Sequence, residues 1–230
     1  DLVARSIYQE MEVTGSGYVL LDAMELKTDP AKRFPGIYEK CKEIGLDLGK
    51  EPIPVVPAAH YFCGGIKTDL HGKTSIKNLY AIGESACTGV HGSNRLASVS
   101  LLEGLFFSGE AAKKIQEKHK QVADGLLASI PEWKFPKQEE DFDTVLIHHD
   151  MLNIQMTMWD YVGILRTRKR LFRALSDLNY LNHRIERFYK EAKLTKEIVN
   201  LRNAVVTATL ITKAALSNPN SRGCHYVVSS

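Results

Sequence analysis

The chain has 230 residues, of which 44% are hydrophobic and 25% charged, and its formal net charge is +3. This is the composition of an ordinary globular protein, long enough for one large domain or two small ones. The small net charge gives no support to a nucleic-acid or anionic membrane partner, and no apolar run reaches the roughly 18 residues that a membrane span needs.

The first 58 residues mix helical and extended patterns. Residues 1–13 carry apolar side chains at helical spacing, and the turn 14–17 follows. We predict a strand at 18–22, a short helix at 30–45, and an extended segment at 53–57 whose prolines exclude it from the centre of a sheet. Because the helical pattern is already in progress at Asp1, without an initiating Met or a cap, we expect the natural N-terminus to lie upstream.

Residues 59–120 read as a strand, a loop of small residues and a long helix. Strands are predicted at 60–67 and 78–83, on either side of a turn at His71 and Gly72. The loop 85–93 follows, and a helix is expected from about 96 to 119. The backbone N–H groups and positive dipole of such a helix start suit an anionic or polar cofactor edge, and glycines in the loop permit close approach.

The remainder of the chain is predicted to be helical after a linker at 121–142. Three helices are expected at about 143–167, 168–192 and 195–216, because prolines disappear until Pro219 and apolar positions recur at helical spacing. Together they predict a small helical bundle, with the basic residues at 166–173 on a solvated face. The methionines of the first helix (Met151, Met156 and Met158) and Trp159 are interpreted as bundle core.

Several motifs within 57–109 resemble the succinate dehydrogenase/fumarate reductase flavoprotein family, and within it the L-aspartate oxidase branch. The resemblance rests on the strings PAAHYFCGG, NLYAIGE, HGSNRLAS and SLLEG, and it continues into TMWDYVGILRTRKRL and NSRGCHY. It implies a mixed α+β and α/β fold made of the end of a capping domain (1–58), the C-terminal part of an FAD-binding domain (59–120), the linker (121–142), an all-α three-helix domain (143–217) and a tail (218–230).

The resemblance also implies roles for five residues. Glu84 would hydrogen-bond FAD, and Ser100 and Leu101 would contact its isoalloxazine ring through the start of the helix. His60 and Arg95 would bind the carboxylates of a dicarboxylate substrate. An arginine suits this task because its planar fork matches a carboxylate with two parallel hydrogen bonds.

The implied reaction is oxidation of L-aspartate to iminosuccinate, the first step of de novo NAD biosynthesis, with oxygen or fumarate as the electron acceptor. The implied location is the cytoplasm, or the plastid in a plant, and quinolinate synthase is the implied pathway partner. No catalytic residue is expected in this chain, because the family's catalytic arginine would precede Asp1; Arg5 does not take that role.

The sequence departs from the family pattern at three points. Val99 replaces the usual asparagine, and Ser93 replaces the usual alanine. The dinucleotide-binding GxGxxG motif is missing, since the nearest approximation, at 15–17, precedes a strand. We therefore expect this chain alone to bind FAD poorly and to show no turnover.

Alternatives remain for the function. A succinate dehydrogenase or fumarate reductase flavoprotein subunit shares the central motifs, although that branch normally has a glycine in place of Ala97 or Ser98. A non-catalytic helical interaction module is the alternative of another class.

Plainer readings also exist for single residues. His60 could be an ordinary strand-end histidine, Arg95 a salt-bridge partner, Glu84 a loop cap and His91 a structural residue. The adjacent pair His148 and His149 cannot share one helix face, and the four scattered cysteines (Cys41, Cys63, Cys87 and Cys224) form no recognisable pattern, so no metal site or disulfide framework is predicted. The cysteine usage favours a reduced, intracellular setting.

Overall fold

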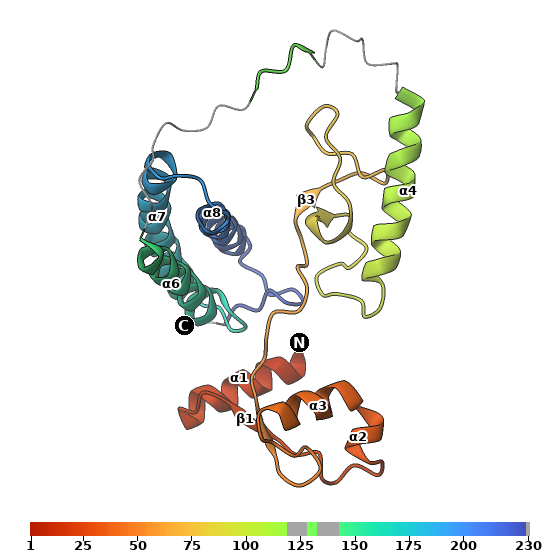
Figure 1. The fold of residues 1–230 in the computed structure, drawn as a ribbon, viewed down its shortest axis with the longest axis vertical. Coiled ribbons are helices and arrows are strands. Elements are labelled where there is room, and N and C mark those ends of the chain that lie inside the picture. The colour runs from red at the N-terminus through yellow and green to blue at the C-terminus, as the bar shows by residue number, and fades with distance from the viewer. Residues whose placement is uncertain (119–127, 133–142, 229–230) are drawn as a thin grey trace. The chain divides into compact units, whose positions relative to one another are not determined.

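The computed structural model describes residues 1–118, 128–132 and 143–228 (Figure 1). The chain forms two compact units, Asp1–His60 and Tyr61–Ser230. The predicted linker at 121–142 lies outside the described residues except for 128–132.

The first unit combines short helices with a two-stranded sheet. Helix α1 (Leu2–Thr14) is capped by Asp1, whose side chain accepts a hydrogen bond from the Leu2 N–H, so the expectation of an uncapped start was wrong. The helix ends at Gly15 in the left-handed conformation. Strands β1 (Val19–Leu21) and β2 (Ile53–Val55) pair antiparallel. Pro54 is therefore in a two-stranded ribbon, which agrees with the prediction that this segment is not a central strand.

The helix predicted at 30–45 is two helices. Helix α2 (Pro30–Arg33) ends at Phe34, and helix α3 (Pro35–Glu43) begins directly after it. A proline has no N–H to continue the hydrogen bonding of α2, so the chain restarts there, with Pro35 at the first position of α3. A small core lies beneath these elements, made of Ala23, Cys41, Leu48 and Ile53.

The second unit begins with an irregular region. Strand β3 (Ile66–Lys67) pairs in parallel with β4 (Ala86–Cys87), which follows the short 3-10 helix η1 (Gly83–Ser85). The prediction of a strand at 78–83 was wrong. Asn78 is left-handed, with a φ of 64°, and Tyr80 makes a single isolated bridge to Lys73. The strand predicted at 60–67 is reduced to its last two residues.

Helix α4 (Ser100–Lys118) begins four residues later than predicted. Ser98 has a φ of 63°, which a right-handed helix cannot contain, and the Glu103 N–H then donates to the Val99 carbonyl at 2.8 Å. Phe107 and Ala111 are buried on one side of α4, whereas Leu101, Leu102, Leu105 and Phe106 are exposed within the described residues.

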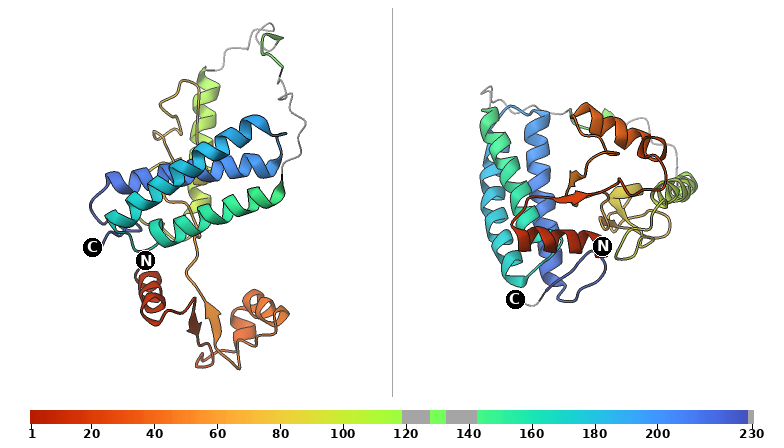
Figure 2. Two further views of the ribbon diagram at one scale, coloured as in Figure 1. Left: turned by 90° about the vertical axis from the view of Figure 1, so that its left-hand side faces the viewer. Right: turned by 90° about the horizontal axis from the view of Figure 1, so that it is seen from below.

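Helices α6 (Thr144–Val162), α7 (Arg168–Glu191) and α8 (Lys196–Ser217) pack against one another, as Figure 2 shows in its left view. Each begins at a side-chain cap, from Asp143, Thr167 and Thr195 respectively. The three predicted helices are therefore confirmed. Fully buried Leu178, Ile185, Leu201 and Val205 contribute to the core.

Two interpretations of bundle residues need correction. Met151 and Met158 pack on the core, but Met156 is 61% exposed and Trp159 is 37% exposed, because these two side chains lie on the outer face of α6. Arg166 does not belong to a solvated face, because its guanidinium turns inward to backbone carbonyls and His225. No helix among the described residues is long and apolar enough to cross a membrane.

Candidate functional site

The predicted cofactor loop connects β4 to α4 in the second unit. Gly83, Gly89 and Gly92 all have positive φ angles, and an added Cβ at any of them would meet no atom within 4 Å. The loop therefore leaves its backbone open beside the start of a 19-residue helix. The space beside these glycines and the positive end of the helix dipole favour a polar or anionic ligand edge.

Arg95 is held at this helix start by two contacts. Its Nε donates to the Ser100 hydroxyl at 2.7 Å, and its guanidinium carbon lies 4.8 Å from the centre of the Tyr61 ring. A cation at a helix N-terminus is disfavoured by the dipole, so these contacts compensate for an unfavourable position. The structure thus brings together two predicted site residues, Arg95 and Ser100.

Glu84 lies in η1 and is exposed. One of its carboxylate oxygens accepts a hydrogen bond from the Phe62 N–H at 2.8 Å. This contact joins η1 to the segment that follows Tyr61. The loop-capping interpretation therefore has direct structural support, and the contact of Glu84 with FAD stays a prediction.

Tyr61 is a site residue that the sequence did not reveal. Its ring contacts Arg95 on its face and His91 at 5.2 Å, edge-on, and its hydroxyl donates to Glu103 at 3.3 Å. Burial raises the pKa of Tyr61, and the negative charges of Glu103 and Glu84 raise it further, against a lowering hydrogen bond with Ser100. Tyr61 therefore stays protonated beside the arginine.

A buried carboxylate lies beneath the loop. Glu103 on α4 faces Nε2 of His91 at 2.9 Å and accepts a hydrogen bond from the Thr88 hydroxyl. His91 in turn accepts the Leu96 N–H through Nδ1 at 3.3 Å. His91 therefore has a structural role, because its ring links the loop backbone at Leu96 to Glu103 on α4. The sequence had left this interpretation open.

His60 and Leu101 are not placed in contact with the other predicted residues. His60 is exposed and is the last residue of the first unit, whereas Arg95 belongs to the second. Leu101 is 88% exposed. The pairing of His60 with Arg95 across a substrate, and the contact of Leu101 with a flavin, stay predictions.

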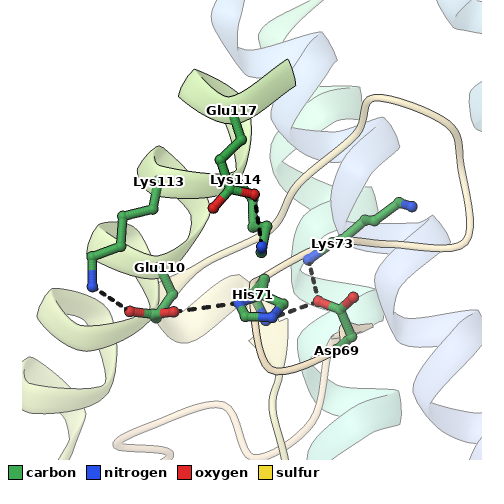
Figure 3. Close-up of polar contacts among 7 residues, drawn as sticks. All are labelled: Asp69, His71, Lys73, Glu110, Lys113, Lys114 and Glu117. Carbon is green, nitrogen blue, oxygen red and sulfur yellow. Dashed lines mark hydrogen bonds and ion pairs between the residues drawn. The ribbon is translucent and has the colours of Figure 1, made fainter. Parts of the chain in front are cut away.

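A second polar cluster joins the turn 69–73 to the C-terminal half of α4 (Figure 3). The Asp69 carboxylate accepts the N–H groups of His71 and Lys73, at 2.9 and 3.0 Å, and His71 lies 3.3 Å from Glu110. Lys113 pairs with Glu110, and Lys114 pairs with Glu117. The positive and negative side chains of this cluster pair with one another. We therefore interpret it as a structural contact that holds the turn 69–73 against α4.

Two family models match the chain. A model of the FAD binding domain matches residues 1–101, and a model described as the fumarate reductase flavoprotein C-terminus matches residues 151–228. Together they cover the predicted cofactor loop and the helical bundle. No group of metal-binding side chains was found among the described residues.

Curated relatives and solved structures match nearly the whole chain. It is 43% identical to an L-aspartate oxidase of Yersinia pestis, over 99% of the chain and 43% of that protein, and 38% identical to a chloroplastic L-aspartate oxidase of Oryza sativa, over 98% of the chain and 37% of that protein. A quinol-fumarate reductase structure superposes with a TM-score of 0.79 at 26% identity, over 99% of this chain and 43% of that one.

The chain spans about two fifths of the length of the curated relatives that it matches. The family models and the relatives nevertheless agree on the family of the chain and on its cofactor. The chain belongs to the L-aspartate oxidase branch of the succinate dehydrogenase/fumarate reductase flavoprotein family, whose cofactor is FAD.

Proposed function

We propose that this chain forms part of an FAD-dependent enzyme that oxidises L-aspartate to iminosuccinate. The observation that carries the proposal is the position of Arg95, held at the start of α4 by Ser100 and Tyr61. In the described part of the chain, the side-chain hydrogen bond of Arg95 uses Nε. Its terminal nitrogens would then bind a carboxylate of the substrate.

The residues of the loop suit one edge of FAD. The space beside Gly83, Gly89 and Gly92 permits close approach, and the positive dipole at the start of α4 favours the negative charge of a reduced flavin. Glu84, Ser100 and Leu101 are the proposed contacts. The pyrophosphate would need a glycine-rich motif that the 230 residues do not contain.

The protein groups in this proposal orient the substrate and the flavin supplies the redox chemistry. FAD held by Glu84, Ser100 and Leu101 would supply the two-electron oxidation of the Cα–N bond of aspartate to an imine. Arg95 and His60 would bind the two carboxylates and thereby select a dicarboxylate. Oxygen or fumarate is the proposed final acceptor, and quinolinate synthase the proposed pathway partner.

The proposed location is the cytoplasm. The rice relative is named as chloroplastic, so a plant origin would place the protein in the plastid instead.

The test is an assay of the complete enzyme with L-aspartate and with succinate, following flavin reduction without oxygen. We expect aspartate to bleach the flavin spectrum and succinate to leave it oxidised. Bleaching by succinate alone would favour the dehydrogenase alternative, and bleaching by neither would favour the non-catalytic module. The 230-residue chain by itself is expected to retain little FAD on gel filtration, and tight stoichiometric FAD would contradict that expectation.

A further inference from the structure

The chain after α8 folds into a tight turn. The Arg222 N–H donates to the His225 carbonyl at 2.7 Å, and the His225 N–H donates back to the Arg222 carbonyl at 3.0 Å. Gly223 and Cys224 therefore form the tip of a turn, and we call residues 222–225 the tail turn. Below it, the Ser221 hydroxyl bonds the Val227 backbone at 3.0 and 2.9 Å and closes the hairpin.

The base of the tail turn is anchored to the helical bundle by Arg166, between α6 and α7. Its backbone N–H donates to the Tyr226 carbonyl at 3.0 Å, and its carbonyl accepts the Val228 N–H at 2.8 Å. Its guanidinium donates to Nδ1 of His225 at 2.8 Å. Because a guanidinium only donates, the ring hydrogen of His225 lies on Nε2, which donates to the Asn218 carbonyl at 2.8 Å.

The tip of the tail turn lies against the loop that carries Arg95. The Cys224 N–H donates to the Ser93 carbonyl at 2.9 Å, and the Cys224 thiol donates to the Asn94 side chain at 3.0 Å. Gly223 has a φ of +56°, and a Cβ added there would overlap the Ser93 carbonyl oxygen. A glycine is therefore required for the turn to approach this closely.

Cys63 also contacts this loop. Its thiol accepts a hydrogen bond from the backbone N–H of Arg95 and contacts the thiol of Cys224. Burial raises the pKa of Cys63, and the neighbouring Cys224 raises it further. Residues 93–95 thus contact both the tail turn and Cys63.

From these contacts we infer that the tail turn positions Arg95, and that Gly223 is a positioning residue for dicarboxylate binding. The inference rests on the proposed role of Arg95 as a substrate ligand. The physical reason is that Cys224 bonds the Ser93 carbonyl and the Asn94 side chain, and the backbone just before the arginine sets the direction of its side chain. The helical bundle holds the tail turn through Arg166.

The first test compares Gly223→Ala with Gly15→Ala in the complete enzyme. Gly15 has a similar φ of +67° but open space around an added Cβ, so it reproduces the backbone strain without the overlap. We expect Gly223→Ala to raise the KM for aspartate about tenfold or more, with a smaller change in kcat and FAD retained. Gly15→Ala should leave KM within about twofold of the wild type. An unchanged KM in Gly223→Ala, or an equal rise in both variants, would overturn the inference.

A second test does not depend on turnover. Diamide removes one hydrogen from each of two adjacent thiols and joins them, so in the wild type it should link Cys63 to Cys224, detectable by peptide mass spectrometry. The link should be lost in Gly223→Ala, and absence of the link in the wild type would overturn the contact. If the enzyme does not oxidise aspartate but the link forms and depends on Gly223, the proposed function fails while the contact of the tail turn with the loop stands.

Cys224→Ser is the conservative variant. Serine keeps the backbone N–H to Ser93 and replaces the thiol donor by a hydroxyl. Its KM should therefore remain within about threefold of the wild type. A rise as large as in Gly223→Ala would transfer the role from the backbone of the tip to the thiol, contrary to the inference.

Discussion

The side chains of His91 and Glu103 meet at 2.9 Å, and both are nearly inaccessible, at 8% and 2% exposure. The contact joins the middle of the cofactor loop to the first turn of α4. A buried carboxylate needs hydrogen-bond donors around it, and here Thr88 and Tyr61 also supply them. The carboxylate of Glu103 is therefore the point at which three separate parts of the site are held together.

Replacing Glu103 by glutamine should loosen this loop. Thr88 donates to one carboxylate oxygen and Tyr61 to the other, so an amide nitrogen in place of either oxygen leaves one hydroxyl without its acceptor, at a cost of about 1–3 kcal/mol. Hydrogen exchange at the Leu96 amide, which donates to His91, should become faster in Glu103→Gln. Glu43→Gln is the control, because Glu43 forms an exposed pair with Lys40 that contributes about 0.5 kcal/mol or less. Equal exchange at Leu96 in both variants would contradict the role of Glu103.

Replacing Arg95 by lysine should weaken substrate binding more than FAD binding. Lysine keeps the charge but loses the Nε bond to Ser100 and the planar fork. Loss of one charge-assisted hydrogen bond, about 1.5–3 kcal/mol, corresponds to a fall in kcat/KM for aspartate of roughly 10- to 100-fold. Arg173→Lys, on the exposed face of α7 beside Asp177, should leave kcat/KM unchanged. Wild-type kinetics in Arg95→Lys would remove Arg95 from the substrate site.

Truncating a core leucine of the bundle should destabilise it strongly. Leu178 is 0% exposed in the core cluster of α6, α7 and α8, and Leu→Ala at such sites costs about 2–5 kcal/mol. Leu210 on α8 is 61% exposed, so Leu210→Ala should cost about 1 kcal/mol or less. Urea denaturation followed by circular dichroism measures both, and similar midpoints for the two variants would be inconsistent with this core.

The turn at Asp69 should lose stability in acid. Hydrogen bonds from the N–H groups of Lys73 and His71 lower the pKa of Asp69, against a smaller raising effect of burial. A carboxyl with a lowered folded-state pKa contributes stability above its unfolded value, near 3.9, and this contribution is lost as the pH falls through the folded value. Asp69→Asn should therefore lower the melting temperature at pH 6, and the difference should shrink as the pH falls through the folded-state pKa of Asp69. A difference that persists unchanged at low pH would show that the charge of Asp69 is not the cause.

Local patterns in the sequence were enough to predict the three helices of the bundle. Asp143, Thr167 and Thr195 each precede an amphipathic run, and a cap followed by helical periodicity depends only on near neighbours. The start of α4 was predicted four residues too early, because the helical pattern does not reveal that Ser98 takes a left-handed backbone conformation. The strand predicted at 78–83 failed because an apolar run does not reveal whether another strand will lie beside it.

By itself the sequence determined the family, the cofactor and the order of the helices, because motifs and periodicity are properties of short segments. Only the tertiary structure decided that Glu103 would lie against Thr88, His91 and Tyr61, and that Cys224 would reach Asn94 from 130 positions away. Hydrophobic periodicity specifies which face of an element is buried but not its partner. Which distant groups meet is therefore decided by packing of the folded chain, and that packing places the loop at Arg95.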